Sequence, residues 1–227
     1  MDLRYTRAME QSPPPIPRFL LFVALALVAL IAFSAGVYLA RSDRTGGPGP
    51  DVPGLLWPDP VVLGDFALDD ARGGRFDTRR LRDRWTLMFF GFTHCPDVCP
   101  TTLATLASVR TRLADLPAFA QRGQVVFVSV DAARDTPEAL RAYVDYFDPT
   151  IEAATAEPER LDLLTRQLGI LYARMDTGDA AEYSFDHTAS VLLIGPRQEF
   201  LGVFAPPHAP GELASRVRAI INFMETR

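Results

Sequence analysis

Side chains that bind metals or act as nucleophiles are scarce in this chain. Its 227 residues include only two cysteines and three histidines, and every basic side chain is an arginine. A structural zinc ion takes four strong protein ligands, so the lack of a third cysteine makes such a site a poor fit. The absence of lysine indicates a compositional bias of the genome rather than a chemical role.

The chain also has no excess of positive charge. The formal net charge at pH 7 is −5, which argues against a nucleic-acid partner, because proteins that bind nucleic acids carry basic surfaces. The sequence has no internal repeats. With 48% hydrophobic residues, the chain is long enough for one domain of ordinary size plus appendages.

Both cysteines lie in one short segment, Gly91–Leu103, with the sequence GFTHCPDVCPTTL. The residue before a proline is pushed out of the helical region, so we expect Cys95 to be non-helical. Pro100 suits the first position of a helix, which makes Cys99 the expected capping residue. The apolar run Thr86–Phe92 before this segment predicts a buried strand.

This arrangement of strand, loop and helix predicts that Cys99 lies at the positive end of a helix dipole, where thiols have depressed pKa values. We therefore expect a functional dithiol. Two other uses stay open at this point, namely inert buried cysteines and a structural disulfide. A disulfide across so short a loop would add little stability, because its closure entropy is small.

The segment Phe19–Ala40 contains no charged residue. In a helix, at about 1.5 Å per residue, it is long enough to cross the roughly 30 Å hydrocarbon layer. We expect an uncleaved transmembrane anchor, because a signal peptide has a shorter apolar region and a cleavage motif of small residues. Arginines before the segment predict a cytoplasmic tail at 1–18. Residues 41–60, rich in glycine and proline, predict a linker to one domain at 61–227.

The domain is expected to alternate strands with helices. Prolines, glycines and capping residues at the ends of apolar periodic segments indicate the helices. Such alternation predicts a mixed α/β sheet with helices on both faces. The expected elements are a hairpin from Val61–Leu68 to Arg75–Phe76, a helix over 103–116 ended by Pro117, a strand at Val125–Val130, a helix from Pro137 capped by Thr136, a helix at Pro158–Leu168 stopped by Gly169, strands at Ala189–Ile194 and Phe200–Phe204, and a last helix over 213–221.

The three histidines are the remaining candidates for metal binding. His187 stands in a loop before an expected strand, and loops at strand ends form the sites of open α/β sheets. It is therefore the histidine best placed to meet the cysteine loop. His94 and His208 are weaker candidates, and Asp186 is a candidate for supporting a ligand or supplying a weak oxygen donor.

Three segments of the chain occur in the order and spacing of one known family. They are Gly91–Leu103, the segment SVDAARDTPEALRAYV at Ser129–Val144, and FDHTASVLLIGP at Phe185–Pro196. These segments resemble the Sco/SenC family of membrane-anchored copper proteins, and the resemblance extends from about Val61 to the C-terminus. It implies a thioredoxin-like fold for this part of the chain.

The resemblance also implies a site and a role. It implies that Cys95, Cys99 and His187 bind one copper ion, which the family delivers to the dinuclear copper centre of cytochrome c oxidase. The implied partners are the copper-receiving subunit of that oxidase and an upstream copper donor. The implied location is the bacterial inner membrane, with a single membrane-spanning helix and the C-terminal domain in the periplasm.

Ligand chemistry agrees with copper. Thiolates are soft ligands that select Cu(I), and two thiolates with one imidazole suit a three-coordinate copper site. Whether Cu(II) is also bound stays open. Asp131, Arg134 and Asp135 match a further family segment, DxxRD, and their expected use is an ion pair at the strand end and a helix cap.

Other functions compete with copper delivery. The same dithiol would serve a thiol-disulfide oxidoreductase acting on a partner outside the membrane, and only copper binding requires His187. The segment VCPTT resembles that of a peroxidase, but such enzymes have threonine where Pro96 stands. A pure interaction protein with an incidental disulfide is the last alternative. No catalytic residue is assigned beyond the redox-active candidates Cys95 and Cys99, and whether the chain is an enzyme stays open.

Overall fold

The structure is a computed structural model that describes residues 18–42, 52, 54–56, 60–179 and 182–226. The chain divides into two units, residues 1–47 and 48–227. The predicted tail at 1–18 lies outside the described residues except for Arg18, and so does most of the predicted linker at 41–60.

Helix α1, Arg18–Ser42, is the element described in the first unit. It contains the predicted anchor Phe19–Ala40. Among the side chains that the structure describes, no helix is both long enough and apolar enough to cross a membrane. The anchor therefore stays a prediction from the sequence.

The second unit is built on an eight-stranded mixed sheet. Its strands are β1 Val61–Val62, β2 Ala67–Asp70, β3 Arg75–Asp77, β4 Trp85–Gly91, β5 Gly123–Ser129, β6 Glu152–Thr155, β9 Val191–Ile194 and β10 Glu199–Phe204. They lie in the order β1-β10-β9-β4-β5-β6-β2-β3, and β4, β5 and β6 run parallel while the other neighbours are antiparallel. All seven residues of β4 are buried, so this strand forms the centre of the core.

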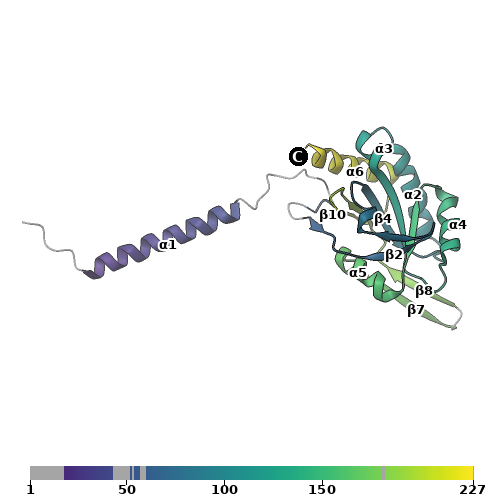
Figure 1. Cartoon of the computed structure of the whole chain (residues 1–227), viewed down its shortest axis with the longest axis horizontal. Coiled ribbons are helices and arrows are strands. Elements are labelled where there is room, and N and C mark those ends of the chain that lie inside the picture. Colours follow the sequence, from purple (N-terminus) through teal and green to yellow (C-terminus); the bar gives the residue numbers. More distant parts are fainter. Residues whose placement is uncertain (1–17, 43–51, 53, 57–59, 180–181, 227) are drawn as a thin grey trace, which may run out of the picture. The chain divides into compact units, whose positions relative to one another are not determined.

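Helices cover both faces of the sheet, as predicted. They are α2 Val98–Arg112, α3 Pro117–Arg122, α4 Pro137–Phe147, α5 Pro158–Leu168 and α6 Pro210–Glu225, with a 3-10 helix η1 at Thr78–Arg80. α2 contacts both α4 and α6, and α3 also contacts α6, which groups these four on one face. Figure 1 shows α5 on the other side, below β2.

Several helix ends follow from local sequence. α4 begins after Thr136, whose Oγ1 accepts a hydrogen bond from Ala139 N at 3.3 Å. α5 ends where Gly169 adopts a left-handed φ of 65°, as a glycine after a helix commonly does. The predicted role of Pro117 is wrong. It is the first residue of α3. The N–H at that position makes no hydrogen bond within the helix, so a proline is tolerated there.

The predicted N-terminal hairpin is present as β2 and β3, which pair antiparallel. Its first arm begins at Ala67, later than predicted. Val61–Val62 instead forms β1, which pairs with β10 at the opposite edge of the sheet. The strand β6 is absent from the prediction.

Part of the predicted linker packs on the domain. Leu56 N donates a hydrogen bond to the Leu201 carbonyl oxygen at 2.8 Å, and Leu55 forms an isolated bridge with Gly202. Both leucines are half-buried against the core. They therefore belong to the folded unit, although the sequence places them in the linker.

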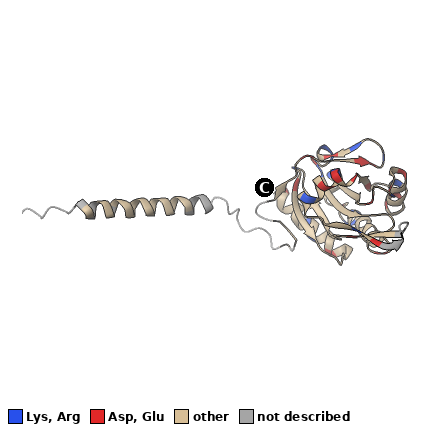
Figure 2. Cartoon of the chain, turned by 90° about the horizontal axis from the view of Figure 1, so that it is seen from below, with Lys and Arg blue, Asp and Glu red and all other residues tan. Residues whose placement is uncertain are grey.

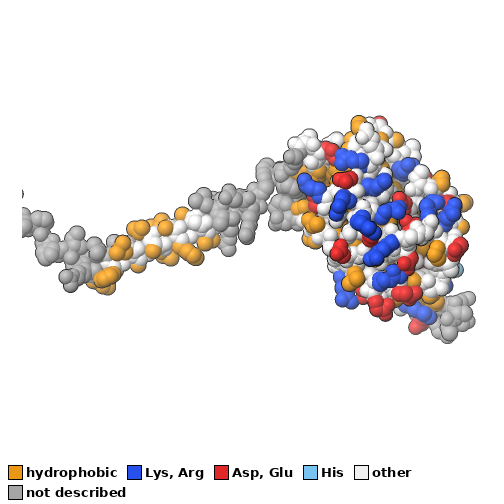
Figure 3. Space-filling view, in the orientation of Figure 1, with side chains coloured by type: hydrophobic (Ala, Val, Ile, Leu, Met, Phe, Trp, Pro, Cys, Tyr) orange, Lys and Arg blue, Asp and Glu red, His pale blue; other side chains and the backbone are white. Residues whose placement is uncertain are grey.

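Charged residues of both signs are interspersed along the ribbon of the domain (Figure 2). Arginines are prominent on the face shown in Figure 3. Two arginines of the domain join separate elements: Arg72, after β2, lies 2.6 Å from Asp145 in α4, and Arg110 in α2 lies 3.2 Å from Asp148.

A second hairpin follows α5 and is absent from the prediction. Its strands β7 Tyr172–Asp179 and β8 Glu182–His187 form a two-stranded sheet of their own. Figure 1 shows this hairpin extending from one end of the domain. His187 is therefore the last residue of a strand, and the predicted loop position is wrong.

Candidate metal centre

The cysteine loop joins β4 to α2. Cys95 is non-helical, as predicted, and half-buried. The predicted cap is wrong, because α2 begins at Val98 and Asp97 takes the capping position. Cys99 lies within the first turn, followed by Pro100. Proline fits there because the first amides of a helix have no partner inside it.

The Cys99 side chain is completely buried, with 0% of the residue exposed. Burial raises the pKa of this thiol, and hydrogen bonding to Cys95 and the charge of Asp135 raise it further, against an opposing hydrogen bond with the backbone of Phe92. The predicted depression of this pKa is wrong, because the loss of hydration outweighs the helix dipole. Without a bound cation, Cys99 is a neutral thiol at pH 7.

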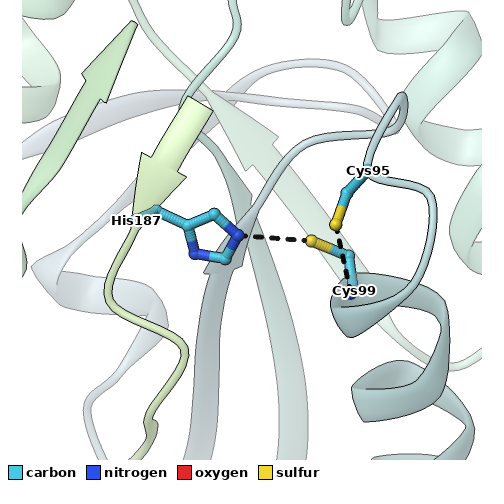
Figure 4. A group of neighbouring side chains, drawn as sticks. All are labelled: Cys95, Cys99 and His187. Atoms are coloured by element: carbon cyan, nitrogen blue, oxygen red, sulfur yellow. Dashed lines mark hydrogen bonds between the residues drawn. The ribbon is translucent and has the colours of Figure 1, made fainter. Parts of the chain in front are cut away.

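His187 completes a group of three donors (Figure 4). Its Nε2 lies 3.5 Å from Cys99 Sγ, and Cys95 Sγ accepts a hydrogen bond from Cys99 N at 3.4 Å. One donor atom from each of the three residues lies within 4.8 Å of the others. Figure 4 shows the imidazole reaching from β8 toward the two sulfurs at the start of α2. The structure thus brings together the three predicted ligands.

The two cysteines are free thiols in this structure. Cys95 and Cys99 are therefore not joined in the structural disulfide that the sequence left as an alternative. The alternative of inert buried cysteines does not fit Cys95, which is half-buried beside an imidazole and a second thiol.

The surroundings of His187 prepare its ring for a cation. Nδ1 lies 3.2 Å from the Thr188 carbonyl oxygen, which can only accept, so we assign the ring proton to Nδ1. The lone pair of Nε2 then faces Cys99. Burial lowers the pKa of His187, which keeps the ring neutral at pH 7. Phe89 and Phe92 hold it edge-on, with centroids at 6.1 and 5.9 Å.

Gly91, the last residue of β4, makes room for the buried thiol. A Cβ atom there would lie 2.6 Å from Cys99 Sγ and 2.9 Å from the Phe127 ring. Real side chains do not approach so closely, so only glycine fits without displacing one of these groups. The sequence analysis did not assign this role, although a glycine at the end of a buried strand signals a close approach.

Asp135 holds the cysteine loop through hydrogen bonds to Thr93. This completely buried carboxylate accepts hydrogen bonds from Thr93 N at 3.0 Å, from Thr93 Oγ1 at 2.5 Å and from Ser129 Oγ at 2.5 Å. Its predicted use as a helix cap is wrong, because Thr136 caps α4. The predicted ion pair at the strand end is confirmed, with Arg134 Nε 2.5 Å from Asp131.

The other candidate donors lie outside the group. His94 is largely exposed, with Nδ1 3.0 Å from Thr93 Oγ1. His208 Nε2 lies 3.0 Å from the Ala189 carbonyl oxygen. Asp186 is exposed on β8, and the group of three donors does not include it.

Comparison with protein families decides the relationship. Residues 58–222 match the sequence profile of SCO1/SenC. The chain belongs to the SCO1/SenC family. Within this family it is 34% identical over 158 residues to human "Protein SCO1 homolog, mitochondrial", covering 70% of this chain and 52% of that protein. It is also 34% identical over 154 residues to a "Putative copper-binding protein" of Stutzerimonas stutzeri, covering 67% and 74%. The chain thus aligns with about half of the human relative.

Solved structures of SCO1/SenC proteins share the fold. Arabidopsis thaliana ScoI with copper bound superposes with a TM-score of 0.65 at 29% identity, over 71% of this chain and 99% of that one. Bradyrhizobium japonicum ScoI with copper bound gives 0.61 at 32%, over 70% and 98%. The mixed α/β domain described above is therefore the thioredoxin-like domain of Sco proteins.

Proposed function

We propose that this chain is a membrane-anchored metallochaperone that binds one copper ion through Cys95, Cys99 and His187. The observation that carries the proposal is the convergence of two sulfurs and one imidazole nitrogen within 4.8 Å. Its copper-bound relatives from Arabidopsis thaliana and Bradyrhizobium japonicum support copper as the ion.

The donor set favours Cu(I). Thiolates are soft ligands that select this ion, and Nε2 of His187 offers a neutral lone pair beside them. A bound cation would also stabilise the thiolate of Cys99, offsetting the burial that keeps this group protonated in the metal-free protein. The aromatic rings around His187 shield the site from water on that side. Binding of Cu(II) is left open by the donor set.

Transfer of the ion to a partner protein requires that the partner's ligands can reach the site. Cys95 is half-buried, whereas Cys99 is buried in the core. An incoming ligand therefore meets Cys95 first, and Cys99 is the last protein sulfur to release the ion.

The recipient and the location are part of the same proposal. The role of the family supports delivery to the dinuclear copper centre of cytochrome c oxidase, with an upstream protein as donor. The charge-free segment Phe19–Ala40 supports a single-pass anchor in a bacterial inner membrane, with the domain in the periplasm.

A competition titration tests the metal site. The full chain in detergent, reduced and metal-free, is mixed with Cu(I) held by a coloured chelator. The wild type should remove one Cu(I) per chain, and His187→Ala should bind more weakly by an order of magnitude or more. His94→Ala is the matched control and should behave as the wild type does. Equal competition by wild type and His187→Ala would refute the third ligand.

One observation favours a second candidate, a thiol-disulfide oxidoreductase. The two sulfurs lie close together with Cys95 accessible, so the Cys95 thiolate can attack a partner disulfide and Cys99 can then displace the partner. The partner gains two electrons as two thiols, and the chain is left with a Cys95–Cys99 disulfide. Equilibration with glutathione buffers measures its potential. A dithiol that stays reduced even in oxidising glutathione buffers has too high a potential to reduce a partner, which would argue against a reductase.

A further inference from the structure

The hairpin that carries His187 has no strand pairing with the main sheet. β7 and β8 hydrogen-bond to each other in a separate two-stranded sheet. Contacts other than a β-ladder must therefore fix the distance between His187 and the sulfurs.

A hollow lies where the hairpin meets the body of the domain. It has a volume of about 280 Å³ and is lined by the loop after β5 and the start of α5 on one side and by Tyr172, Arg174 and Tyr183 of the hairpin on the other. At its edges, Tyr172 and Phe185 of the hairpin pack against the core. Near His187 the contact is aromatic, with the rings of Phe185 and Phe92 5.7 Å apart.

Next to this hollow, three side chains bridge the two parts. Arg134, in the loop after β5, donates from Nη1 to the Tyr183 carbonyl oxygen at 3.0 Å and stacks 3.6 Å from the Tyr183 ring centroid. Tyr183 Oη donates to Asp131 Oδ1 at 2.8 Å. Arg134 Nε closes the cycle by donating to Asp131 Oδ2 at 2.5 Å. We call Asp131, Arg134 and Tyr183 the clasp.

Asp131 anchors the clasp in the body of the domain. The Asp131 side chain is 1% exposed, and Asp131 N donates to Ser129 Oγ at 3.0 Å. The same Ser129 hydroxyl donates to Asp135, which in turn holds Thr93 of the cysteine loop. One polar network therefore holds both the loop with the thiols and the hairpin with the imidazole.

We infer that the clasp is a positioning device for His187: Asp131, Arg134 and Tyr183 hold the hairpin so that the imidazole Nε2 lies 3.5 Å from Cys99 Sγ, and none of the three is itself a ligand. The inference rests on the proposed copper site for one of its readouts. The hairpin is also held by the hydrogen bond from Tyr172 Oη to Asp162 in α5 and by the contact of Phe185 with Phe92. Loss of the clasp therefore loosens the hairpin without detaching it, and it weakens copper binding through the position of His187.

Tyr183→Leu in the full chain is the first test, because it removes the Tyr183 hydroxyl and ring from the clasp. It leaves in place the ion pair of Asp131 and Arg134 and the hydrogen bond from Arg134 to the backbone carbonyl of residue 183. The Cu(I) affinity should fall by about tenfold, as on loss of a group that orients a ligand. Tyr146→Leu is the matched control, since Tyr146 is 84% exposed on α4. It should leave the affinity unchanged.

A double-mutant cycle separates positioning from a general loss of structure. In the His187→Ala background, Tyr183→Leu should cause no further loss of Cu(I) affinity, because the clasp then has nothing to position. An equal loss in both backgrounds would overturn the inference.

Hydrogen exchange of the metal-free chain gives a readout that does not depend on copper. Amides of β8 should exchange faster in Tyr183→Leu, whereas those of β4 should not change. Unchanged exchange in β8 would overturn the inference. If the wild type fails to bind Cu(I), the proposed function fails, while this experiment still decides the clasp. If Tyr183→Leu does not fold, Tyr183→Phe removes the hydroxyl alone and should give the same changes at smaller amplitude.

Discussion

Nε2 of His187 lies 3.5 Å from Sγ of Cys99, although 88 residues separate the two in sequence. The ring proton on Nδ1 points away, to the Thr188 carbonyl oxygen. This pair joins the two parts of the proposed metal centre, and it brings a protonated thiol to an unprotonated nitrogen.

Copper affinity should therefore depend on pH. Burial raises the pKa of Cys99, so binding must release its proton across the range from about pH 6 to 9. The Cu(I) affinity should rise by about tenfold per pH unit for that proton alone. The lowered pKa of His187 adds little, because the ring is already neutral. Chelator competition at several pH values measures the slope, and a flat profile would contradict the prediction.

The two cysteines should differ in reactivity. Cys95 is half-buried, whereas Cys99 is inaccessible and has a raised pKa. In the metal-free, reduced protein at pH 7.5, iodoacetamide should modify Cys95 at least about tenfold faster than Cys99. Mass spectrometry of the digested protein gives both rates. Equal rates would mean that the loop opens readily in solution.

Gly91→Ala should damage both the fold and the site. The new methyl group would lie 2.6 Å from Cys99 Sγ, so the thiol or the Phe127 ring must move. We expect a loss of about 1–3 kcal/mol in the free energy of unfolding, measured in urea, together with weaker Cu(I) binding. Gly211→Ala is the control, because a Cβ at that position in α6 meets no atom within 4 Å. An equal effect of both changes would contradict the crowding argument.

Asp135→Asn should loosen the cysteine loop and make Cys99 more acidic. The amide cannot accept all three hydrogen bonds that the carboxylate accepts, which should cost about 1–3 kcal/mol in unfolding free energy. The negative charge of Asp135 raises the pKa of Cys99, so its removal should lower that pKa. Thiolate absorbance near 240 nm during a pH titration measures the shift. A shift to higher pH would refute this electrostatic role.

Thr136→Ala should destabilise the domain without changing the site. The alanine cannot accept the hydrogen bond from Ala139 N, and loss of such a cap costs about 1 kcal/mol. Thr111→Ala, within α2, is the control, since alanine is the better helix former there. Urea unfolding of both variants should show the difference, with wild-type Cu(I) affinity in each. If the Thr136→Ala protein were as stable as the wild type, packing alone would hold the start of α4.

Local signals explain what the sequence predicted well. α5 has the predicted bounds, because Pro158 at its start and Gly169 after its end act within a few residues. The three donors were predicted from short motifs of the family. The hairpin β7–β8 was missed because most of the side chains described in β7 are exposed, so no buried apolar run marks the strand, and part of its support comes from distant partners such as Asp131.

Burial explains what the sequence predicted wrongly. The depressed pKa of Cys99 was argued from its position at a helix start, which is a local property. The actual shift is set by the packing of the thiol against the core, which no short segment encodes. The roles of Gly91 and Asp135 likewise depend on atoms from other elements of the fold, so they emerged from the fold rather than from the motifs.

The separation of Cys99 and His187 along the chain has a consequence for biosynthesis. The polypeptide is made at roughly 5–20 residues per second, so the thiols emerge several seconds before the imidazole does. β9, which follows His187, must also be inserted beside β4 before the sheet is whole. During that interval the nascent chain carries both thiols without the imidazole that lies beside them in the folded domain.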